Sequence, residues 1–183
     1  MANIWFTSDL HFGHDREFIW GPRGFSNVEE MNKVEIEKFN SKVQPKDTVY
    51  ILGDIMLGNS AIGEECLKQL NGHKIIILGN HDTNPRIEIY KKYADEVVYA
   101  KMIKAKKRSI YLSHYPTITA NMGDRPGHCT LNFYGHTHQQ NNFYEDRPFM
   151  YHVGVDSHDC YPVSLEEALE NFKAKVAECE SQL

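Results

Sequence analysis

The sequence has no apolar run that approaches the roughly 18–20 residues a helix needs to cross a bilayer. Its N-terminal residues also lack the basic segment of a secretory signal peptide, and the acidic Asp9 follows almost at once. From these absences we expect a cytoplasmic protein without a membrane association.

Paired cysteines and two common enzyme motifs are missing as well. The four cysteines have no CxxC spacing and are scattered at Cys66, Cys129, Cys160 and Cys179. This distribution favours reduced thiols over a disulfide framework or a structural zinc site. The chain contains neither Gly-x-Ser-x-Gly nor a P-loop, so nothing supports a covalent serine hydrolase or a P-loop nucleotide-binding protein.

An excess of positive charge is also absent, because the formal net charge is −5. No global basic field therefore favours nucleic-acid binding. The one basic run, residues 101–108, is interpreted as a solvated hairpin tip. Two bound divalent cations would cancel about four charges locally, so the net charge does not decide whether the substrate is an anion.

What remains is an ordinary globular composition, with 183 residues, 41% hydrophobic and 25% charged. It predicts a single domain spanning residues 1–183. The first half predicts strands and helices in alternation, at 3–7, 27–42, 48–52, 60–70, 74–78 and 86–94. Ser26 and Glu29 have capping-box spacing before the first helix. This β-α-β-α-β-α order predicts parallel strands joined by crossover helices.

The second half predicts mostly β-structure followed by one helix that Ser164 caps. The predicted strands are 96–105 and 109–113, which form a hairpin around Lys106-Lys107-Arg108, and then 131–135, 141–145 and 149–153. The fold class is therefore α/β, with two packed sheets flanked by helices.

Five polar fragments stand out because each follows a short apolar run with β-propensity. They are Ser8-Asp9-Leu10-His11, Gly53-Asp54, Gly79-Asn80-His81-Asp82, Ser113-His114 and Gly135-His136-Thr137-His138. A buried strand that stops at Asp, Asn or His places that side chain at a sheet edge, where five such endings can converge on one site.

Seven candidate metal ligands result, namely Asp9, His11, Asp54, Asn80, His114, His136 and His138. Carboxylates and imidazoles together suit Mn, Fe or Zn. The number of ligands suits two ions that share one carboxylate. Two ions about 3.5–4 Å apart are a standard device for in-line attack on phosphate esters.

These fragments together resemble the calcineurin-like metallophosphoesterase superfamily, whose pattern is D-x-H, G-D, G-N-H-[DE], H and G-H-x-H. The match covers about residues 3–155, and all five elements occur in order. The chain is most similar to small, cap-poor bacterial and phage members, with which it also shares Gly154-Val155-Asp156. The resemblance implies a β-sandwich of two mixed sheets with helices outside.

The resemblance also implies a role for each ligand. The first metal is held by Asp9, His11 and His138, and Asp54 bridges the two ions. The second metal is completed by Asn80, His114 and His136. Manganese is the first choice of metal, with iron, zinc or nickel as alternatives.

His81 is implied as the acid-base residue, which contacts the substrate without binding a metal. Asp82 is expected to orient the His81 imidazole, although a purely structural His-Asp pair is the alternative. The attacking group is expected to be a metal-bound hydroxide.

Substrate contacts are assigned to four residues near these motifs: His14, Arg16, Arg23 and Arg125. A guanidinium group can hold a phosphate, and interleaved aromatic residues can stack on a base. The alternative for the arginines is a surface loop held down by its own aromatic side chains.

The predicted function is two-metal hydrolysis of phosphate esters, with a phosphodiester preferred. Three alternatives stay open: a phosphomonoesterase, a nuclease acting on small nucleotides or nucleic-acid ends, and a non-catalytic metal-binding scaffold. The substrate is expected to be a phosphate ester, possible nucleotides included, and no strong nucleic-acid track is expected. The protein is expected to be a monomer or a homodimer.

Overall fold

The computed structural model describes residues 2–121, 124–125 and 128–181, and its first half builds one mixed sheet. The strand order is β4-β3-β2-β1-β9. Strands β1 (Ile4–Thr7), β2 (Thr48–Leu52), β3 (His73–Ile77) and β4 (Glu96–Val98) are parallel. Strand β9 (Val163–Ser164) returns from the C-terminal region and pairs antiparallel to β1.

The second half builds another mixed sheet, in the order β5-β6-β7-β8. Its strands are β5 (Ala100–Ala105), β6 (Arg108–Ser113), β7 (Leu131–Tyr134) and β8 (Met150–His152). The β5-β6 pair is antiparallel, whereas β6, β7 and β8 are parallel. Both sheets are therefore mixed, as the resemblance implied.

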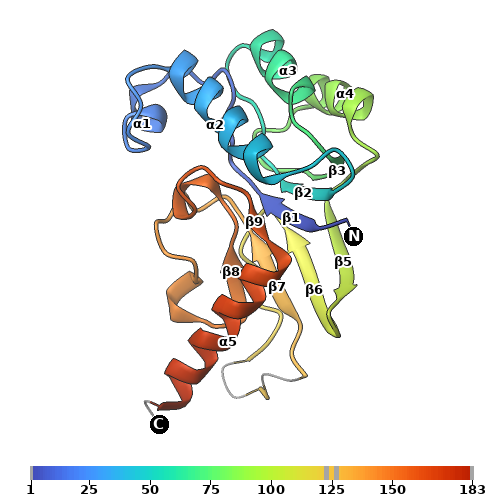
Figure 1. Cartoon of the computed structure of the whole chain (residues 1–183), viewed down its shortest axis with the longest axis vertical. Coiled ribbons are helices and arrows are strands. Elements are labelled where there is room, and N and C mark those ends of the chain that lie inside the picture. The colour runs from blue at the N-terminus through green and yellow to red at the C-terminus, as the bar shows by residue number, and fades with distance from the viewer. Residues whose placement is uncertain (1, 122–123, 126–127, 182–183) are drawn as a thin grey trace.

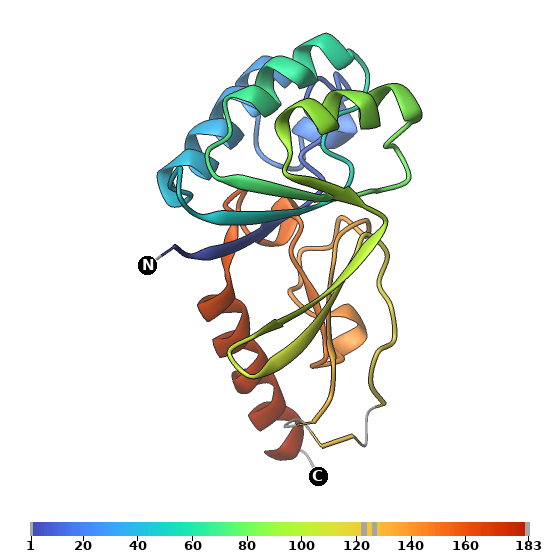
Figure 2. The ribbon, with the colours of Figure 1, turned by 90° about the vertical axis from the view of Figure 1, so that its right-hand side faces the viewer.

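Helices flank the two sheets in the way the alternation predicts. Figures 1 and 2 show α2 (Val28–Lys42), α3 (Ser60–Lys68) and α4 (Asn84–Tyr93) over one face of the first sheet. Helix α5 (Leu165–Ser181) runs alongside the second sheet, and the short α1 (Glu17–Trp20) lies in the segment before α2. No helix among the described residues is long and apolar enough to span a membrane.

The alternation of side chains along β2 separates two apolar cores. Tyr50 and Leu52 belong to the core that the two sheets and α5 share, while Val49 and Ile51 pack with residues of the outer helices. Successive side chains of a strand point to opposite faces, so a fully apolar strand is buried on both. This burial fixes where β2 ends and so where Gly53 and Asp54 lie.

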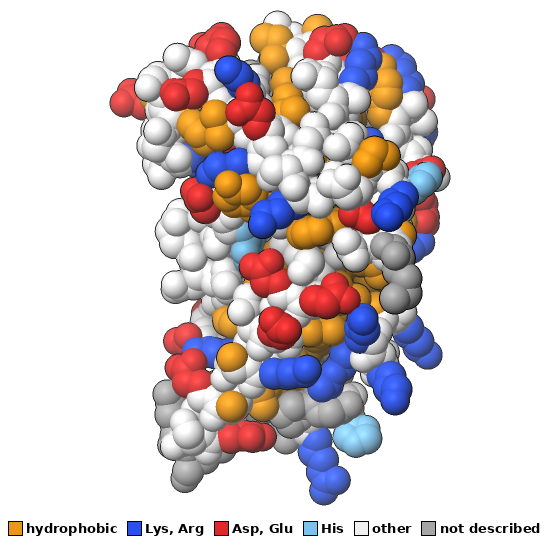
Figure 3. All heavy atoms as spheres, in the orientation of Figure 1, with side chains coloured by type: hydrophobic (Ala, Val, Ile, Leu, Met, Phe, Trp, Pro, Cys, Tyr) orange, Lys and Arg blue, Asp and Glu red, His pale blue; other side chains and the backbone are white. Residues whose placement is uncertain are grey.

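The predicted strand 96–105 is corrected, because it is two strands in different sheets. β4 pairs parallel with β3, and β5 pairs antiparallel with β6. Tyr99, which is 80% exposed, lies at the crossing between them. A hairpin does connect β5 and β6, and the side chains at its tip, Lys106 and Lys107, are exposed as expected. Figure 3 shows basic side chains at the lower right, where these strands lie, with acidic groups nearby.

Two further local predictions are corrected. Residues 141–145 are not a strand, because Tyr144–Asp146 form a 3₁₀ turn in which Glu145 has φ 46°. The α2 cap also begins one residue later than predicted. Asn27 accepts the Glu30 amide at 2.8 Å, and the Glu30 carboxylate accepts the Ser26 amide at 2.8 Å. The cap of α5 is confirmed, because Ser164 Oγ accepts the Glu167 amide at 3.1 Å.

Candidate metal centre

The five polar fragments meet where β1, β2, β3, β6 and β7 end. Backbone hydrogen bonds join the loops there: the Asp9 amide donates to the Gly53 carbonyl at 3.0 Å, and the Gly135 amide donates to the His114 carbonyl at 2.9 Å. The carboxylate of Asp9 also accepts the His136 amide at 2.9 Å. These contacts bring four of the fragments together around a common centre.

A first group of ligand atoms comes from Asp9, His11 and His138, within 4.8 Å of one another. The Nε2 atoms of the two histidines face each other at 3.2 Å, and His138 Nε2 lies 4.0 Å from Asp9 Oδ1. His138 donates its Nδ1 proton to a carboxylate oxygen of Asp156 at 2.8 Å, which leaves the Nε2 lone pair for the centre. All three side chains match the predicted first set.

A second group lies beside the first. Asn80 Oδ1 is 2.9 Å from both His114 Nε2 and His136 Nδ1, and Asp54 Oδ2 is 3.5 Å from His114 Nε2. His114 Nδ1 donates to the Leu52 carbonyl at 2.7 Å, so its Nε2 points its lone pair at these oxygens. Several acceptors that converge without a donor between them form a site for a cation.

The donor chemistry of both groups fits a pair of divalent cations. Asp9 is fully buried, yet its Oδ1 atom has no hydrogen-bond partner among the described residues. Burial raises the pKa of the Asp9 carboxyl group, because a charged carboxylate without water or a counter-charge is unfavourable there. A bound metal ion would neutralise these buried carboxylates, and the neutral imidazoles would supply further ligand atoms.

The carboxylate that the two groups share is Asp9, whereas the resemblance implies Asp54 as the bridging residue. The two groups of His and Asp atoms have Asp9 in common, and Asp54 belongs to the second group alone. Asp54 Oδ1 accepts the His81 amide at 2.9 Å, while its Oδ2 is 3.9 Å from His81 Nε2. Asp54 thus connects the second group to His81, and its bridging role stays a prediction.

Most of the candidate ligands have a left-handed backbone. Positive φ angles occur at Asp9 (58°), His11 (51°), Asp54 (53°), His136 (69°) and His138 (48°). Each non-glycine residue in this region costs of order 1–3 kcal/mol, and such conformations persist only where the surroundings impose them. The strand ends therefore turn sharply at the ligands and aim them inward.

Two glycines allow the loops to approach the carboxylates closely. A Cβ atom on Gly79 would clash with Asp54 Oδ1, and one on Gly135 would lie 2.5 Å from Asp9 Oδ2. Real Cβ atoms do not make such contacts. Gly79 and Gly135 are thus part of the ligand geometry rather than ordinary turn residues.

Replacing Gly79 with alanine should displace the Asp54 carboxylate. We expect a loss of about 1–3 kcal/mol in the free energy of unfolding, typical of overpacking, together with weaker cation binding. Calorimetric melting and a Mn²⁺ titration measure the two effects. An unchanged melting temperature with unchanged Mn²⁺ affinity would contradict the described contact.

His81 lies at the edge of the centre with 43% of its side chain exposed. Its ring centroid is 5.7 Å from that of His11, and its backbone amide is held by Asp54. The imidazole therefore faces open space beside both groups, which suits contact with a substrate. The catalytic role of His81 stays a prediction.

The expected role of Asp82 is corrected. Its carboxylate accepts the amides of Asp54 and Gly79 at 3.0 and 2.7 Å and the Tyr90 hydroxyl at 2.6 Å. These are the contacts of Asp82, and none reaches the His81 imidazole. Asp82 instead holds together the two turns that carry Asp54 and Asn80.

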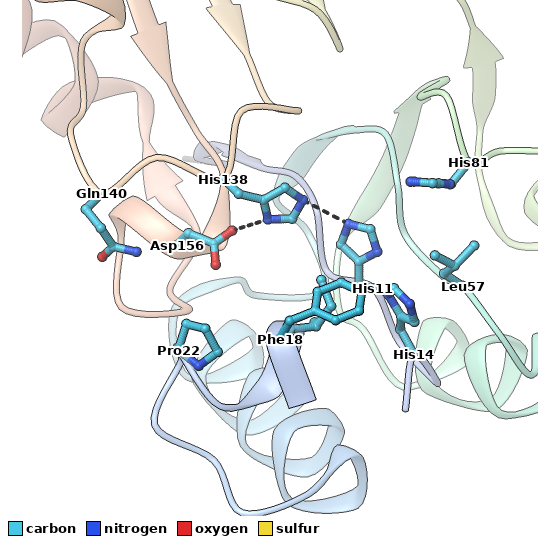
Figure 4. Close-up of a pocket in the computed structure, with 10 residues that line it drawn as sticks. His11, His14, Phe18, Pro22, Leu57, His81, His138, Gln140 and Asp156 are labelled. Carbon is cyan, nitrogen blue, oxygen red and sulfur yellow. Dashed lines mark hydrogen bonds and ion pairs between the residues drawn. The ribbon is translucent and has the colours of Figure 1, made fainter. Parts of the chain in front are cut away.

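A cavity of about 580 Å³ opens beside the first group and is shown in Figure 4. His11, His81 and His138 line the metal side of this cavity. The opposite wall is largely apolar and is formed by Phe18, Ile19, Pro22 and Leu57. The cavity is thus polar at the metal centre and apolar away from it.

The predicted substrate contacts have different positions. His14 lines the cavity, and its ring packs edge-on against Phe18 with centroids 5.7 Å apart. Arg16 is exposed and lines an adjoining hollow of about 540 Å³, which also includes His14 and Leu57. Arg125 is exposed in the loop leading to the start of β7, whereas the histidines follow that strand's end.

Arg23 is not placed on the substrate side. Its side chain is 2% exposed, and it forms ion pairs with Glu35 and Asp156, each at 2.9 Å. The aromatic residues around Arg23 in the sequence do not indicate that its side chain is buried. Asp156 was also missed as a functional residue, although the shared Gly154-Val155-Asp156 was a signal that could have marked it.

The family model for the calcineurin-like phosphoesterase superfamily domain matches residues 3–172. The chain belongs to this superfamily. It is therefore a metal-dependent phosphoester hydrolase, and the two ligand groups described above are its candidate metal-binding residues.

Two sequence relatives of this phosphoesterase span nearly the whole chain. An uncharacterized protein of Methanocaldococcus jannaschii is 33% identical over 177 residues, which cover 91% of this chain and 89% of that protein. The gene 66 protein of Mycobacterium phage D29 is 29% identical over 201 residues, which cover 93% of this chain and 97% of that protein.

Two solved structures have a similar fold. A protein of unknown function from Aquifex aeolicus superposes with a TM-score of 0.70 at 28% identity, covering 93% of this chain and 99% of that one. A novel archaeal phosphodiesterase superposes with a TM-score of 0.50 at 21% identity, covering 84% of each chain. The second likeness concerns the fold alone.

Proposed function

We propose that this phosphoesterase hydrolyses phosphodiesters at a centre of two divalent cations. The observation that carries the proposal is the pair of adjoining ligand groups, which have Asp9 in common and lie beside a cavity of about 580 Å³. When bound, such cations activate water and neutralise phosphate oxygens. We propose manganese, because buried carboxylates and an amide oxygen are hard ligands, with iron, zinc or nickel as alternatives.

The residues of the chain have separate tasks in this reaction. Asp9, His11 and His138 hold the first cation, Asn80, His114 and His136 hold the second, and Asp54 bridges the two. His81 reaches the cavity from beside both groups and donates a proton to the departing alkoxide oxygen. The apolar wall excludes water around the organic part of the substrate and positions it.

Charge in the cavity supports a diester over a monoester. No Lys or Arg is among the described residues that line the cavity of about 580 Å³. A phosphodiester carries one negative charge, whereas a phosphomonoester carries up to two and gains more from nearby cationic side chains. A metal centre without neighbouring Lys or Arg therefore suits the singly charged diester better than the monoester.

Space near the centre supports the same preference. The adjoining hollow of about 540 Å³ shares His14 and Leu57 with the main cavity. A diester has two organic substituents, and two connected hollows give room for both. Arg16, in the second hollow, is then proposed to contact the outer substituent.

The preference is tested with metal-stripped protein refilled with Mn²⁺. We expect bis(4-nitrophenyl) phosphate to be cleaved with a kcat/KM about tenfold or more above that of 4-nitrophenyl phosphate, a difference of about 1.4 kcal/mol in transition-state binding. A higher kcat/KM for the monoester would instead make the protein a phosphatase. Hydrolysis of neither, with Mn²⁺ bound, would contradict both assignments.

A further inference from the structure

A buried arginine lies directly behind the first ligand group. Arg23 donates through Nη2 to the Asp9 carbonyl at 2.8 Å and through Nη1 to the Leu10 carbonyl at 3.3 Å. These carbonyls belong to the turn in which Asp9 and His11 have positive φ angles. The guanidinium thus holds the backbone that aims two of the three ligands.

The same guanidinium reaches the third ligand through a carboxylate. Arg23 Nε and Nη2 donate to the two oxygens of Asp156 at 2.9 and 3.2 Å. Asp156 Oδ2 also accepts the Nδ1 proton of His138 at 2.8 Å. Figure 4 shows this carboxylate behind His138, whose opposite nitrogen faces His11. Arg23 therefore holds the turn that carries Asp9 and His11, and it reaches His138 through Asp156.

Apart from the shared Asp9, whose carboxylate accepts the His136 amide, the second ligand group has separate supports. His114 is oriented by the Leu52 carbonyl, and the turns that carry Asp54 and Asn80 are tied by Asp82, which Tyr90 holds. Neither Arg23 nor Asp156 makes a hydrogen bond with these residues among the contacts of the described chain. Asp9 aside, the two groups are thus positioned by different parts of the fold.

We propose that Arg23 and Asp156 are positioning residues that set cation affinity at the first ligand group alone. This proposal rests on the two-cation centre proposed above. A carboxylate behind a ligating histidine fixes the ring orientation and strengthens it as a ligand, and losing such a partner typically weakens metal binding by about 10–100-fold. A planar guanidinium suits this position because its fork binds both oxygens of Asp156 and leaves a donor for the backbone.

The first test replaces Asp156 with asparagine and titrates metal-stripped protein with Mn²⁺ by calorimetry. We expect wild-type protein to take up two ions and the Asp156→Asn variant to bind one of them about 10–100-fold more weakly. Arg23→Lys should give the same selective loss, because one ammonium group cannot replace the fork. If only one of these two variants folds, the Mn²⁺ titration of that variant decides the test.

Glu35→Gln is the matched control. Glu35 is buried and accepts from Arg23 Nη1 at 2.9 Å, but among the described residues it makes no hydrogen bond to His138 or Asp9. The variant replaces a buried carboxyl group of the same cluster with an amide and keeps an acceptor for Arg23. We expect it to change stability and to retain both Mn²⁺ affinities, which separates a positioning role from a general effect of the cluster.

Two single-site backgrounds identify which ion is affected. In Asn80→Ala protein, where the first group is the intact one, adding Asp156→Asn should weaken the remaining Mn²⁺ by about 10–100-fold. In His138→Ala protein, where the second group is intact, the same addition should leave Mn²⁺ affinity unchanged. Equal losses in both backgrounds, or no loss in either, would overturn the positioning role. A wild-type protein that binds one ion would contradict the two-cation centre itself.

Discussion

Asp54→Asn should abolish paired metal binding and reduce kcat/KM by about 10³-fold or more. Asp54 Oδ1 accepts the His81 amide, so the amide nitrogen of asparagine takes the place of Oδ2, which faces His114 at 3.5 Å. An N–H group would then point where the second cation binds. A bound cation contributes several kcal/mol to the transition state, and each 1.4 kcal/mol is tenfold in rate.

The matched control for this variant is Asp47→Asn. Asp47 is also fully buried, and its carboxylate accepts the Asn3 amide at 2.8 Å and the Trp5 indole at 3.0 Å, away from the metal centre. The control should lower the melting temperature without changing metal content. Metal analysis and steady-state kinetics decide the result, and an Asp54→Asn protein with two bound ions and normal turnover would refute the role of Asp54.

His81→Ala should keep both cations and lower kcat by about 10²-fold or more, the usual size of a lost acid-base group. Asp54 holds the backbone amide of residue 81, which alanine retains, so the ligand geometry should survive. The side chain is 43% exposed and lies beside the groups rather than within them. Metal content and turnover are measured on the same preparation.

The dependence on leaving group separates acid catalysis from simple substrate binding. If His81 protonates the departing oxygen, its removal should slow alkyl diesters strongly and 4-nitrophenyl diesters weakly, because nitrophenolate leaves without a proton. His73→Ala, which removes an exposed histidine outside the centre, should affect neither substrate. Loss of a cation from His81→Ala would show instead that His81 is a ligand.

The convergence of the seven candidate ligands could be predicted, because each of them follows the end of a strand. The apolar runs that define β2 and β3 are buried on both faces, so their pairing register fixes Asp54 and Asn80 at neighbouring positions of one sheet edge. The alternation of strands and helices then predicts the parallel order. Local composition is sufficient for this part of the fold.

Side-chain partners at the site could not be predicted in the same way. Asp82 follows His81 in the chain, but its carboxylate turns back to two amides and Tyr90, eight residues further along. Arg23 is buried because Asp156, far away in the sequence, faces it. Both outcomes depend on long-range packing, which neighbouring residues do not specify.

The splitting of residues 96–105 has a similar cause. The segment has continuous β-propensity, but Glu96–Val98 pair with β3 and Ala100–Ala105 pair with β6. Which sheet offers a free edge is a property of the whole fold. The turn at Tyr144–Asp146 likewise depends on positive φ angles that composition did not signal.

The most direct test of the two-cation account is a titration of metal-stripped protein with Mn²⁺ in which bound ions and diester hydrolysis are measured in the same samples. The account predicts two ions per chain and hydrolysis that develops as the second ion binds. Full hydrolysis with a single ion bound per chain would contradict it.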